Sequence, residues 1–281
     1  MAQTFDQLVR AFNGASNLPQ PSKSPLRLSA LLESGDPSPA EIEAIVHSDP
    51  ALTAGLLKTA SAAAFGRTRP VGSIREAVMV LGFRALRSVA IALWTQALVC
   101  EGKHKSRLDL VRFSTGSYFT GILASELSSV SPEPKGEGAW SSEEVFAFGV
   151  LGRLGVGLLS LLAPDEFDRV YAKAESDKTS LETAFQALHG RSLHELALVG
   201  ARSMALPESL CAALETLSTG QGLPGAVAAT SFVTTALQVA DSNGMGIGKW
   251  DVSLDLPDDH ELAELIERAK ASSTGTLLKS A

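Results

Sequence analysis

An all-α fold is predicted for this chain from the way its helices begin and from the lack of strand-like patterning. A Ser or Thr followed three residues later by Glu stands at the start of five apolar-periodic segments. In such a capping box the hydroxyl accepts a hydrogen bond from a first-turn amide, and the Glu accepts one from the amide of the cap residue. The five pairs are Ser38/Glu41, Ser73/Glu76, Ser141/Glu144, Thr179/Glu182 and Ser192/Glu195. No segment alternates apolar and polar residues at a period of two for long enough to predict a sheet.

The caps and the apolar periodicity define the expected helices in chain order. They span residues 3–13, 26–33, 39–47, 50–60, 74–81, 83–99, 107–129, 142–162, 165–175, 180–189, 193–204, 207–217, 224–242 and 258–270. Pro39 at the first helical position supports the start of 39–47. Asp49 precedes Pro50, which restricts it to extended geometry, and Asp49 is expected to cap 50–60.

Glycines mark two unusual places among these helices. Gly82 separates 74–81 from 83–99 and is expected to adopt the left-handed conformation of a helix C-cap. The helix expected over 142–162 contains Gly149, Gly152, Gly155 and Gly157. Each glycine costs a helix roughly 1 kcal/mol relative to alanine, so this group predicts tight packing, a kink or incomplete helicity.

The composition argues against several classes of protein. Of 281 residues, 45% are hydrophobic and 20% charged, which is ordinary for a globular chain of one or two domains. No apolar run reaches the roughly 18–20 residues of a membrane span, and the N-terminus lacks signal-peptide features. The net charge of −7 argues against general nucleic-acid binding. Cys100 and Cys211 match no zinc or redox spacing. We therefore expect a cytoplasmic protein with no membrane insertion and no cofactor.

Breaks in composition suggest how the chain is organised. Residues 1–14 are expected to form an N-terminal helical extension. Residues 15–245 form the main domain, with packed helical subregions at about 15–130 and 140–245 on either side of a Pro/Gly-rich loop. Residues 246–281 are expected to hold a C-terminal helix and a flexible tail.

A long stretch of the first half resembles a known signalling family. From Asp49 the chain reads Asp-Pro-Ala-Leu, then a helix ending in Thr-Ala-Ser, a Phe-Gly turn, Ser-Ile-Arg-Glu-Ala and, up to Arg87, Leu-Gly-Phe-Arg-Ala-Leu-Arg. The order and spacing resemble those of the HDOD domain, the "HD-related output domain" of bacterial signalling proteins and a degenerate relative of HD-type phosphohydrolases. The lead-in Leu18-Pro19-Gln20-Pro21 and the stretch from Leu193 to Glu208 resemble the family more loosely. The resemblance implies an all-helical, HDOD-like fold with a regulatory role.

The resemblance also implies a metal site whose ligands have been replaced. HD enzymes carry Gly-Leu-Leu-His-Asp-Ile-Gly where this chain has Gly-Val-Leu-Gly-Arg-Leu-Gly, so Gly152 and Arg153 take the positions of the His-Asp ligand pair. A later histidine of the family falls on Leu193, and Asp241 is the one candidate left from an HD-type ligand set. Glycine has no donor, and a protonated guanidinium has no lone pair for a metal. We therefore expect Gly152, Arg153, Leu193 and Asp241 to form a vestigial, metal-free pocket without catalytic residues.

The histidines give no alternative metal site. None of His47, His104, His189, His194 and His260 is followed by Asp. His189 and His194 are five residues apart, which does not place them on one helix face. All five are interpreted as surface or cap residues.

A cluster of arginines is the second candidate site. Arg67, Arg69, Arg75, Arg84 and Arg87 fall close together in an otherwise acidic chain. Guanidinium groups that converge can bind phosphate or carboxylate in a fork geometry, which suggests a nucleotide or an acidic partner surface. The alternative is a solvated helix face with local ion pairs, such as Arg75 with Glu76 or Glu43.

The functional hypothesis is a non-catalytic bacterial signalling or regulatory module. It would bind a signalling protein supplied in trans, and the vestigial pocket would hold a small, nucleotide-like ligand if it holds any. Two alternatives remain open: a metal-dependent nucleotide phosphohydrolase of the HD class, and a receptor for a nucleotide or cyclic dinucleotide that uses the arginine cluster.

Overall fold

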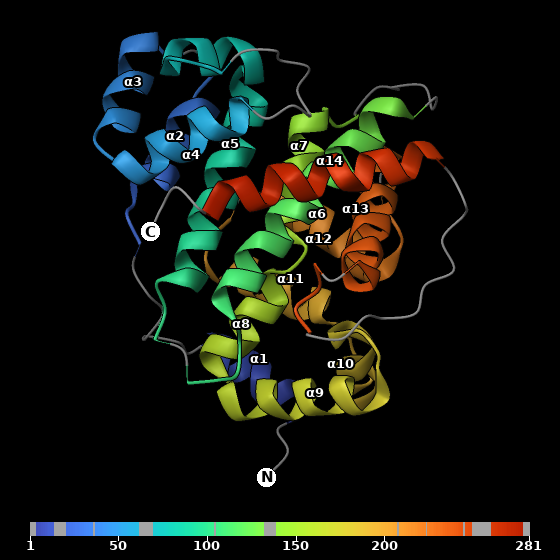
Figure 1. Cartoon of the computed structure of the whole chain (residues 1–281). Coiled ribbons are helices and arrows are strands. Elements are labelled where there is room, and N and C mark those ends of the chain that lie inside the picture. The colour runs from blue at the N-terminus through green and yellow to red at the C-terminus, as the bar shows by residue number, and fades with distance from the viewer. Residues whose placement is uncertain are drawn as a thin grey trace.

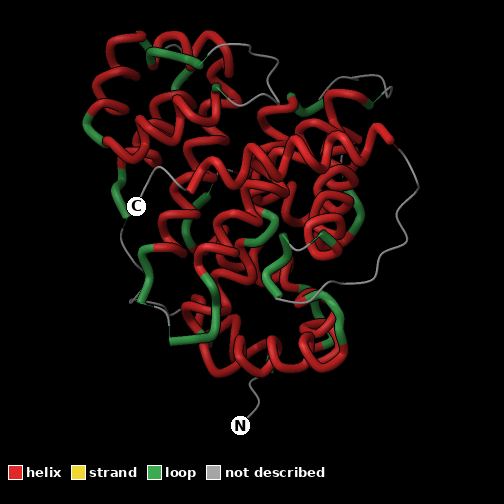
Figure 2. Tube along the Cα trace, viewed as in Figure 1, coloured by secondary structure: helices red, strands yellow, loops and turns green. Residues whose placement is uncertain are grey.

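A computed structural model of the chain describes residues 4–13, 21–35, 37–61, 70–103, 105–131, 139–206, 208–222, 224–243, 245–248 and 260–277. All regular secondary structure in these residues is α-helical (Figure 2), so the all-α prediction is confirmed. The order is α1 (Phe5–Asn13), α2 (Ser24–Glu33), α3 (Pro39–His47), α4 (Pro50–Ala60), α5 (Ile74–Cys100), α6 (Leu110–Val130), α7 (Ser142–Leu151), α8 (Leu154–Leu162), α9 (Pro164–Asp177), α10 (Leu181–His189), α11 (Leu193–Ser203), α12 (Glu208–Thr219), α13 (Pro224–Ser242) and α14 (His260–Leu277).

Side-chain caps fix the starts of several helices as predicted. Full capping boxes form at the starts of α3, α7 and α11, where both the cap hydroxyl and the Glu accept backbone hydrogen bonds. Asp49 accepts a hydrogen bond from the Leu52 amide and caps α4. At α5, Ser73 caps the Glu76 amide, but the Glu76 carboxylate accepts from Gly72.

Helix α5 changes direction at Gly82, which separates two helical segments as the sequence predicts, but its ψ lies outside the left-handed helical conformation that was expected. Gly82 has φ +71° and ψ 167°, while the residues on either side are helical. A side chain at a positive φ is strained, so glycine is suited to this bend. The bend divides α5 into the two segments that were expected at 74–81 and 83–99.

The prediction of a single helix over residues 142–162 is wrong. Helix α7 ends at Leu151, Gly152 and Arg153 form a turn, and α8 begins at Leu154. The tight packing that the glycines predict is present: a Cβ added to Gly149 would lie 2.7 Å from the Cα of Gly121 in α6. The break brings Arg153 to the junction of two helices, which matters for the pocket described below.

The helices pack in two connected groups (Figure 1). Helices α2, α3 and α4 gather around α5 at one end of the molecule. Helix α6 has its main contacts with α7, α13 and α14, and α14 crosses it along one face. Toward the other end, α8 contacts α9 and α11, and α1 packs against α11 and α8. The predicted N-terminal extension is thus attached to helices from the second half of the chain, and α6 also contacts mainly helices from that half.

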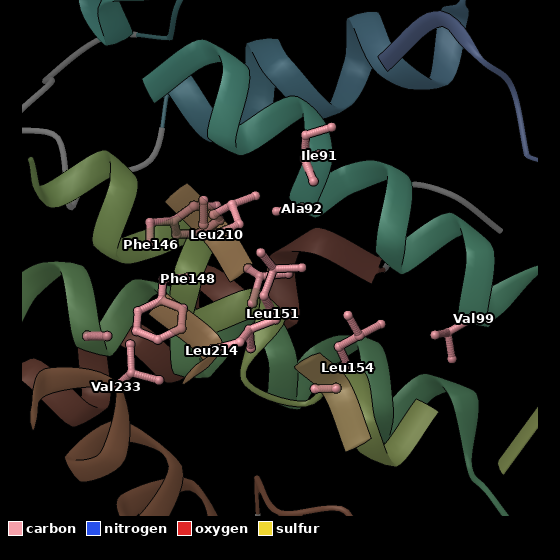
Figure 3. Packing of buried hydrophobic residues seen from close by; sticks show 14 of the residues in the cluster. Ile91, Ala92, Val99, Phe146, Phe148, Leu151, Leu154, Leu210, Leu214 and Val233 are labelled. Carbon is pink, nitrogen blue, oxygen red and sulfur yellow. The ribbon is translucent and has the colours of Figure 1, made fainter. Parts of the chain in front are cut away.

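One continuous cluster of buried apolar side chains joins both groups. Figure 3 shows part of it, where Ile91 of α5, Phe148 of α7, Leu154 of α8, Leu210 of α12 and Val233 of α13 face a common interior. Burying one side chain of this size contributes about 1.5–3 kcal/mol, so the shared core holds the helices around the candidate site in place.

Among the residues that the structure describes, two helical stretches are long and apolar enough to cross a membrane by length and composition alone, which the sequence reasoning had not expected. They are Ile74–Cys100 and Ser142–Leu162, and the most apolar parts of these stretches are 56% and 89% buried inside the protein. Such burial is typical of core helices, and the second stretch is interrupted at Gly152 and Arg153. The cytoplasmic location remains a prediction.

Candidate functional site

A pocket of about 310 Å³ opens beside the α7–α8 break. Its walls come from this break, the first residues of α10 and α11, the last turns of α13 and the loop 246–248. All four residues expected in a vestigial pocket line it: Gly152, Arg153, Leu193 and Asp241. The structure thus brings together residues that are separated by up to 89 positions in the sequence, since Asp241 lies that far beyond Gly152.

Arg153 is buried beneath this pocket. Its side chain is only 3% exposed. Its three guanidinium nitrogens are out of contact with solvent and donate no hydrogen bond among the described residues. Helix α6 makes room for the group at Gly116, where an added Cβ would lie 2.8 Å from Nη1 of Arg153. An unsatisfied, buried guanidinium is costly, so a compensating charge nearby has a large effect on stability.

Asp241 supplies that charge. Its Oδ1 lies 3.7 Å from Nη2 of Arg153, which is an ion pair but too long for a hydrogen bond. Burial lowers the pKa of Arg153, and Asp241 partly offsets this effect. Burial also raises the pKa of Asp241, and Arg153 opposes that shift. The Asp241 side chain is still 26% exposed, so it faces both the arginine and the pocket.

The loop after α13 closes one side of the pocket. The Met245 amide donates to the carbonyl of Ala240 at 3.0 Å, and Nη2 of Arg112 in α6 donates to the carbonyl of Gly248 at 2.5 Å. A Cβ added to Gly246 would lie 2.7 Å from Oδ1 of Asp241, so the loop backbone lies directly against the carboxylate. These contacts hold the loop, Asp241 and α6 together at the rim.

Glu182 and His194 form a second polar wall. The Leu193 amide, at the start of α11, donates to the Glu182 carboxylate at 3.0 Å. Burial raises the pKa of Glu182 to about 7, although this hydrogen bond works against the shift. Nδ1 of His194 lies 3.7 Å from Oε2 of Glu182. Burial lowers the pKa of His194 to about 4, so the imidazole is neutral at physiological pH.

The predicted capping box at Thr179 and Glu182 is wrong. Ser180 is the cap residue of α10, and its hydroxyl accepts a hydrogen bond from the Thr183 amide. The cap is shifted by one residue because two hydroxyl residues are adjacent in the sequence. Glu182 is consequently not used as a cap and bonds to Leu193 of the next helix.

The interpretation of the histidines as surface or cap residues is wrong for two of them. His194 lines the pocket. The His189 side chain is 2% exposed, contacts Oε1 of Glu166 at 2.9 Å and stacks on Phe185. Gly190 follows His189 with φ +66° and ends α10, so the two histidines lie on different helices as expected. Sequence reasoning missed both Glu182 and His194 as pocket residues.

The described side chains do not supply a ligand set for a metal ion. Among the residues that the structure describes, no group of three or more His, Cys, Asp or Glu side chains could hold one. At the positions that correspond to the HD ligands, Gly152 and Leu193 have no donor atom and Arg153 presents a cation.

The three described arginines of the cluster do not share a common carboxylate partner. Arg67 and Arg69 lie outside the described residues. The other three arginines pair with carboxylates of three different helices. Arg75 contacts Glu43 of α3 at 3.3 Å, Arg84 contacts Glu144 of α7, and Arg87 contacts Glu33 of α2 at 3.6 Å. Whether the cluster binds an anion or a partner stays a prediction.

Solved structures with the same fold come from several bacteria. An HDOD domain protein from Geobacter sulfurreducens is 21% identical, with a TM-score of 0.68 over 97% of this chain and 93% of that one. A protein provisionally named a phosphohydrolase, from Shewanella amazonensis SB2B, is 22% identical, with a TM-score of 0.63 over 97% and 93%. A provisionally named signal transduction protein from Marinobacter aquaeolei VT8 is 21% identical, with a TM-score of 0.62 over 98% and 61%. At this identity the likeness establishes the fold alone.

Comparison of the sequence with protein families gives the assignment. No curated protein matches the chain. The model of the HDOD domain family matches residues 18–218, which is well over half of the sequence and includes the α7–α8 break, Glu182 and Leu193. Asp241 and the loop that closes the pocket lie beyond the matched part. The resemblance expected from Asp49 to Arg87 is therefore confirmed, and the chain belongs to the HDOD family.

Proposed function

We propose that this HDOD protein is a non-catalytic signalling module that acts by binding a partner protein. The buried pair of Arg153 and Asp241 carries the non-catalytic part of this proposal. In the resemblance to HD enzymes, Arg153 takes the place of a metal ligand, and here its guanidinium provides a fixed positive charge next to the remaining carboxylate. A metal ion bound at Asp241 would have to lie next to this cation, which electrostatic repulsion disfavours.

The family and one structural relative support the signalling part of the proposal. The Marinobacter relative is named for signal transduction, whereas the Shewanella relative is named for phosphohydrolysis. The donor set at the pocket favours the first role for this chain, because water activation needs a metal with about three protein ligands. Gly152, Arg153 and Leu193 provide none of these.

A surface on α5 is the best candidate for the partner site. Met79 and Phe83 are 73% and 38% exposed, which is high for large apolar side chains. Arg75 and Arg84 belong to the same helix, before and after the bend at Gly82, and their side chains are 67% and 59% exposed. We call these four residues the α5 surface. Exposed apolar side chains on a helix that also carries exposed arginines suit a partner with an apolar anchor and acidic residues around it.

Metal content and hydrolysis test the non-catalytic part. The purified, dialysed protein should contain no stoichiometric iron, manganese or zinc by elemental analysis. It should hydrolyse neither nucleotides nor a generic phosphodiester when these metals are added. Retention of about one metal ion per chain together with hydrolysis would overturn the proposal and favour the HD-class phosphohydrolase.

Comparative capture tests the partner-binding part. Immobilised wild-type protein and two variants are incubated with lysate of the source organism, and bound proteins are quantified by mass spectrometry. Met79→Asp should lose a specific partner, because it places a charge at the more exposed of the two large apolar side chains of the α5 surface. Val111→Asp is the matched control, because Val111 is 63% exposed at the start of α6. Equal capture by wild type and Met79→Asp would rule out the α5 surface as the partner site.

A further inference from the structure

The charges that face the pocket are unevenly distributed. Four of the described lining residues have titratable side chains: Arg153, Glu182, His194 and Asp241. Only one of these is a fixed cation, and its guanidinium nitrogens are out of contact with solvent. The two carboxylates are accessible, since the Glu182 side chain is 32% exposed and that of Asp241 is 26% exposed. A ligand that enters the pocket therefore meets acidic oxygens before it can reach the guanidinium.

The carboxylates also have unused capacity for hydrogen bonds. Asp241 accepts no side-chain hydrogen bond from the described residues. Its contact with Arg153, at 3.7 Å, is too long to count as one. Glu182 accepts from one backbone amide, that of Leu193. A carboxylate has about four lone-pair sites, so both groups can accept further hydrogen bonds from a ligand.

The charges do not balance within the pocket. Asp241 and Arg153 compensate each other, and His194 is neutral because of its burial. Glu182 then remains as the excess negative charge, and no described lining residue neutralises it. A buried carboxylate without a counter-charge is stabilised either by a proton or by a cation.

We propose that this pocket binds a small organic cation, a protonated amine on an apolar body, through the carboxylate of Glu182, the lining carboxylate that is not compensated by Arg153. The inference deepens the proposed function and rests on it, because a pocket with a catalytic metal would attract anions instead. Nδ1 of His194 lies next to Glu182 and is available as a further hydrogen-bond partner.

The remaining lining sets the size and character of the ligand. Apolar side chains supply much of the wall: Val156, Leu181, Leu193, Leu237 and Ile247. A volume of about 310 Å³ is at the lower end of the range for ligand pockets, roughly 300–1,000 Å³. A single ring with a two-carbon chain and an ammonium group suits this volume and this lining.

The binding should depend on pH through Glu182. The groups that face its carboxylate are His194 and Glu195 of α11, while Asp241 and Arg153 belong to other walls of the pocket. His194 has a pKa of about 4 and does not titrate between pH 6 and 8. Glu182 has a pKa of about 7, so its ionised fraction rises from about one tenth to about nine tenths in this range. Affinity for an amine should therefore rise about tenfold from pH 6 to pH 8.

Three probes of equal shape test the proposal by isothermal titration calorimetry. Phenethylamine, 3-phenylpropionate and 2-phenylethanol share the ring and the two-carbon chain but end in a cation, an anion and a neutral hydroxyl. Phenethylamine should bind the wild-type protein at least about tenfold more tightly than the other two at pH 7.5. Its affinity should rise with pH as calculated above, a measurement that needs no variant.

Two isosteric variants locate the interaction. Glu182→Gln should reduce phenethylamine affinity about tenfold and remove the pH dependence, while its amide oxygen can still accept from Leu193. Glu215→Gln is the control, because Glu215 is exposed on α12 and pairs with Arg202 away from the pocket. Circular dichroism establishes that both variants are folded.

Each contrary result has a distinct meaning. Tighter binding of 3-phenylpropionate would show that Arg153 makes the pocket an anion site and would overturn the proposal. Equal binding of the amine and the alcohol, or no binding of any probe at millimolar concentration, would also overturn it. If the same sample is free of metal and inactive in hydrolysis, these outcomes leave the proposed function intact. A bound metal with hydrolysis would instead overturn the proposed function.

Discussion

Removal of the carboxylate at position 241 should destabilise the protein far more than removal of the arginine beside it. Arg153 is 3% exposed, so in Asp241→Asn its positive charge stays buried without a counter-ion. In Arg153→Met the remaining Asp241 carboxylate is 26% exposed and can be hydrated from the pocket. Removal of the Asp241 carboxylate and removal of the Arg153 guanidinium should therefore lower the free energy of unfolding by unequal amounts.

The geometry sets the size of the effect. Two unit charges 3.7 Å apart attract each other by about 4.5 kcal/mol at an effective dielectric constant of about 20. Breaking a buried pair by removing one partner typically costs about 3–5 kcal/mol, and replacing both partners by neutral groups costs little. We expect a loss of about 3–5 kcal/mol for Asp241→Asn, about 0–2 kcal/mol for Arg153→Met, and a similarly small loss for the double variant.

Urea unfolding measures these differences. Far-UV circular dichroism and tryptophan fluorescence should give the same midpoint, which supports a two-state analysis. Asp177→Asn is the control, because Asp177 forms an exposed pair with Lys173 and should cost less than about 1 kcal/mol. Equal losses for Asp241→Asn in the wild-type and Arg153→Met backgrounds would refute the reasoning, since the cost would then not depend on the buried charge.

Three further predictions concern groups around the pocket and the α5 surface. Burial lowers the pKa of His194 from 6.5 to about 4. The contribution of His194 to stability is therefore present above pH 6.5 and is lost as pH falls. The free energy of unfolding should be lower by about 3 kcal/mol at pH 4 for this reason. Burial raises the pKa of Glu182 from 4.5 to about 7, so its contribution is present below pH 4.5 and is lost as pH rises through 7. Urea unfolding between pH 4.5 and 7 should therefore show opposite changes in the slope of the unfolding free energy against pH. His194→Gln should lower this slope and Glu182→Gln should raise it relative to the wild-type protein. If both variants keep the wild-type slope, both assignments are contradicted. Gly116→Ala should cost about 1–3 kcal/mol because its methyl group would meet the carbonyl oxygen of Met245 and the guanidinium of Arg153. The control Gly72→Ala has open space and should cost less, so equal melting temperatures would contradict the close contact. Arg84→Ala should cost about 1–3 kcal/mol because the carboxylate of Glu144, 7% exposed, loses its cationic partner and, among the described residues, keeps only the hydrogen bond from the Ser141 amide. Arg75→Ala should cost below about 1 kcal/mol in the same unfolding assay, and equal losses would count against the buried role of Glu144.

Local signals explain why many helix boundaries could be predicted from the sequence. The bounds of α3 and α4 match the prediction at both ends, and each helix begins with a capping residue followed directly by proline. These signals depend on hydrogen bonds within one turn and do not require knowledge of the fold. The break between α7 and α8 depends instead on contacts with other helices, so the glycines could predict an irregularity but not its place.

The pocket could be predicted only in part, for a similar reason. Gly152, Arg153, Leu193 and Asp241 were found through the resemblance to HD enzymes, which marks positions in the sequence. Glu182 was missed because Thr179 and Ser180 are both able to cap α10, and only the contact with Leu193 of α11 shows which one does. The carboxylate partners of Arg84 and Arg87 belong to distant helices and could not be deduced from charge spacing.

The replacement of ligand residues by an arginine changes the charge that a ligand meets in this fold. A metal ion in an HD enzyme is an accessible cation, open to the oxygens of a phosphate. The guanidinium of Arg153 is delocalised, buried and compensated by Asp241, and its nitrogens are out of contact with the pocket solvent. The accessible groups are then the acidic ones, Asp241 and Glu182, so the preference of the pocket is expected to change from anions to cations. Since this argument depends on the burial of one side chain, Gly116→Ala, whose methyl group would clash with the carbonyl oxygen of Met245 and lie 2.8 Å from Nη1 of Arg153, should weaken amine binding as well as stability. Unchanged phenethylamine affinity in that variant, together with a clear loss of stability, would show that the packing of Arg153 and Met245 around Gly116 supports the fold without setting the charge preference of the pocket.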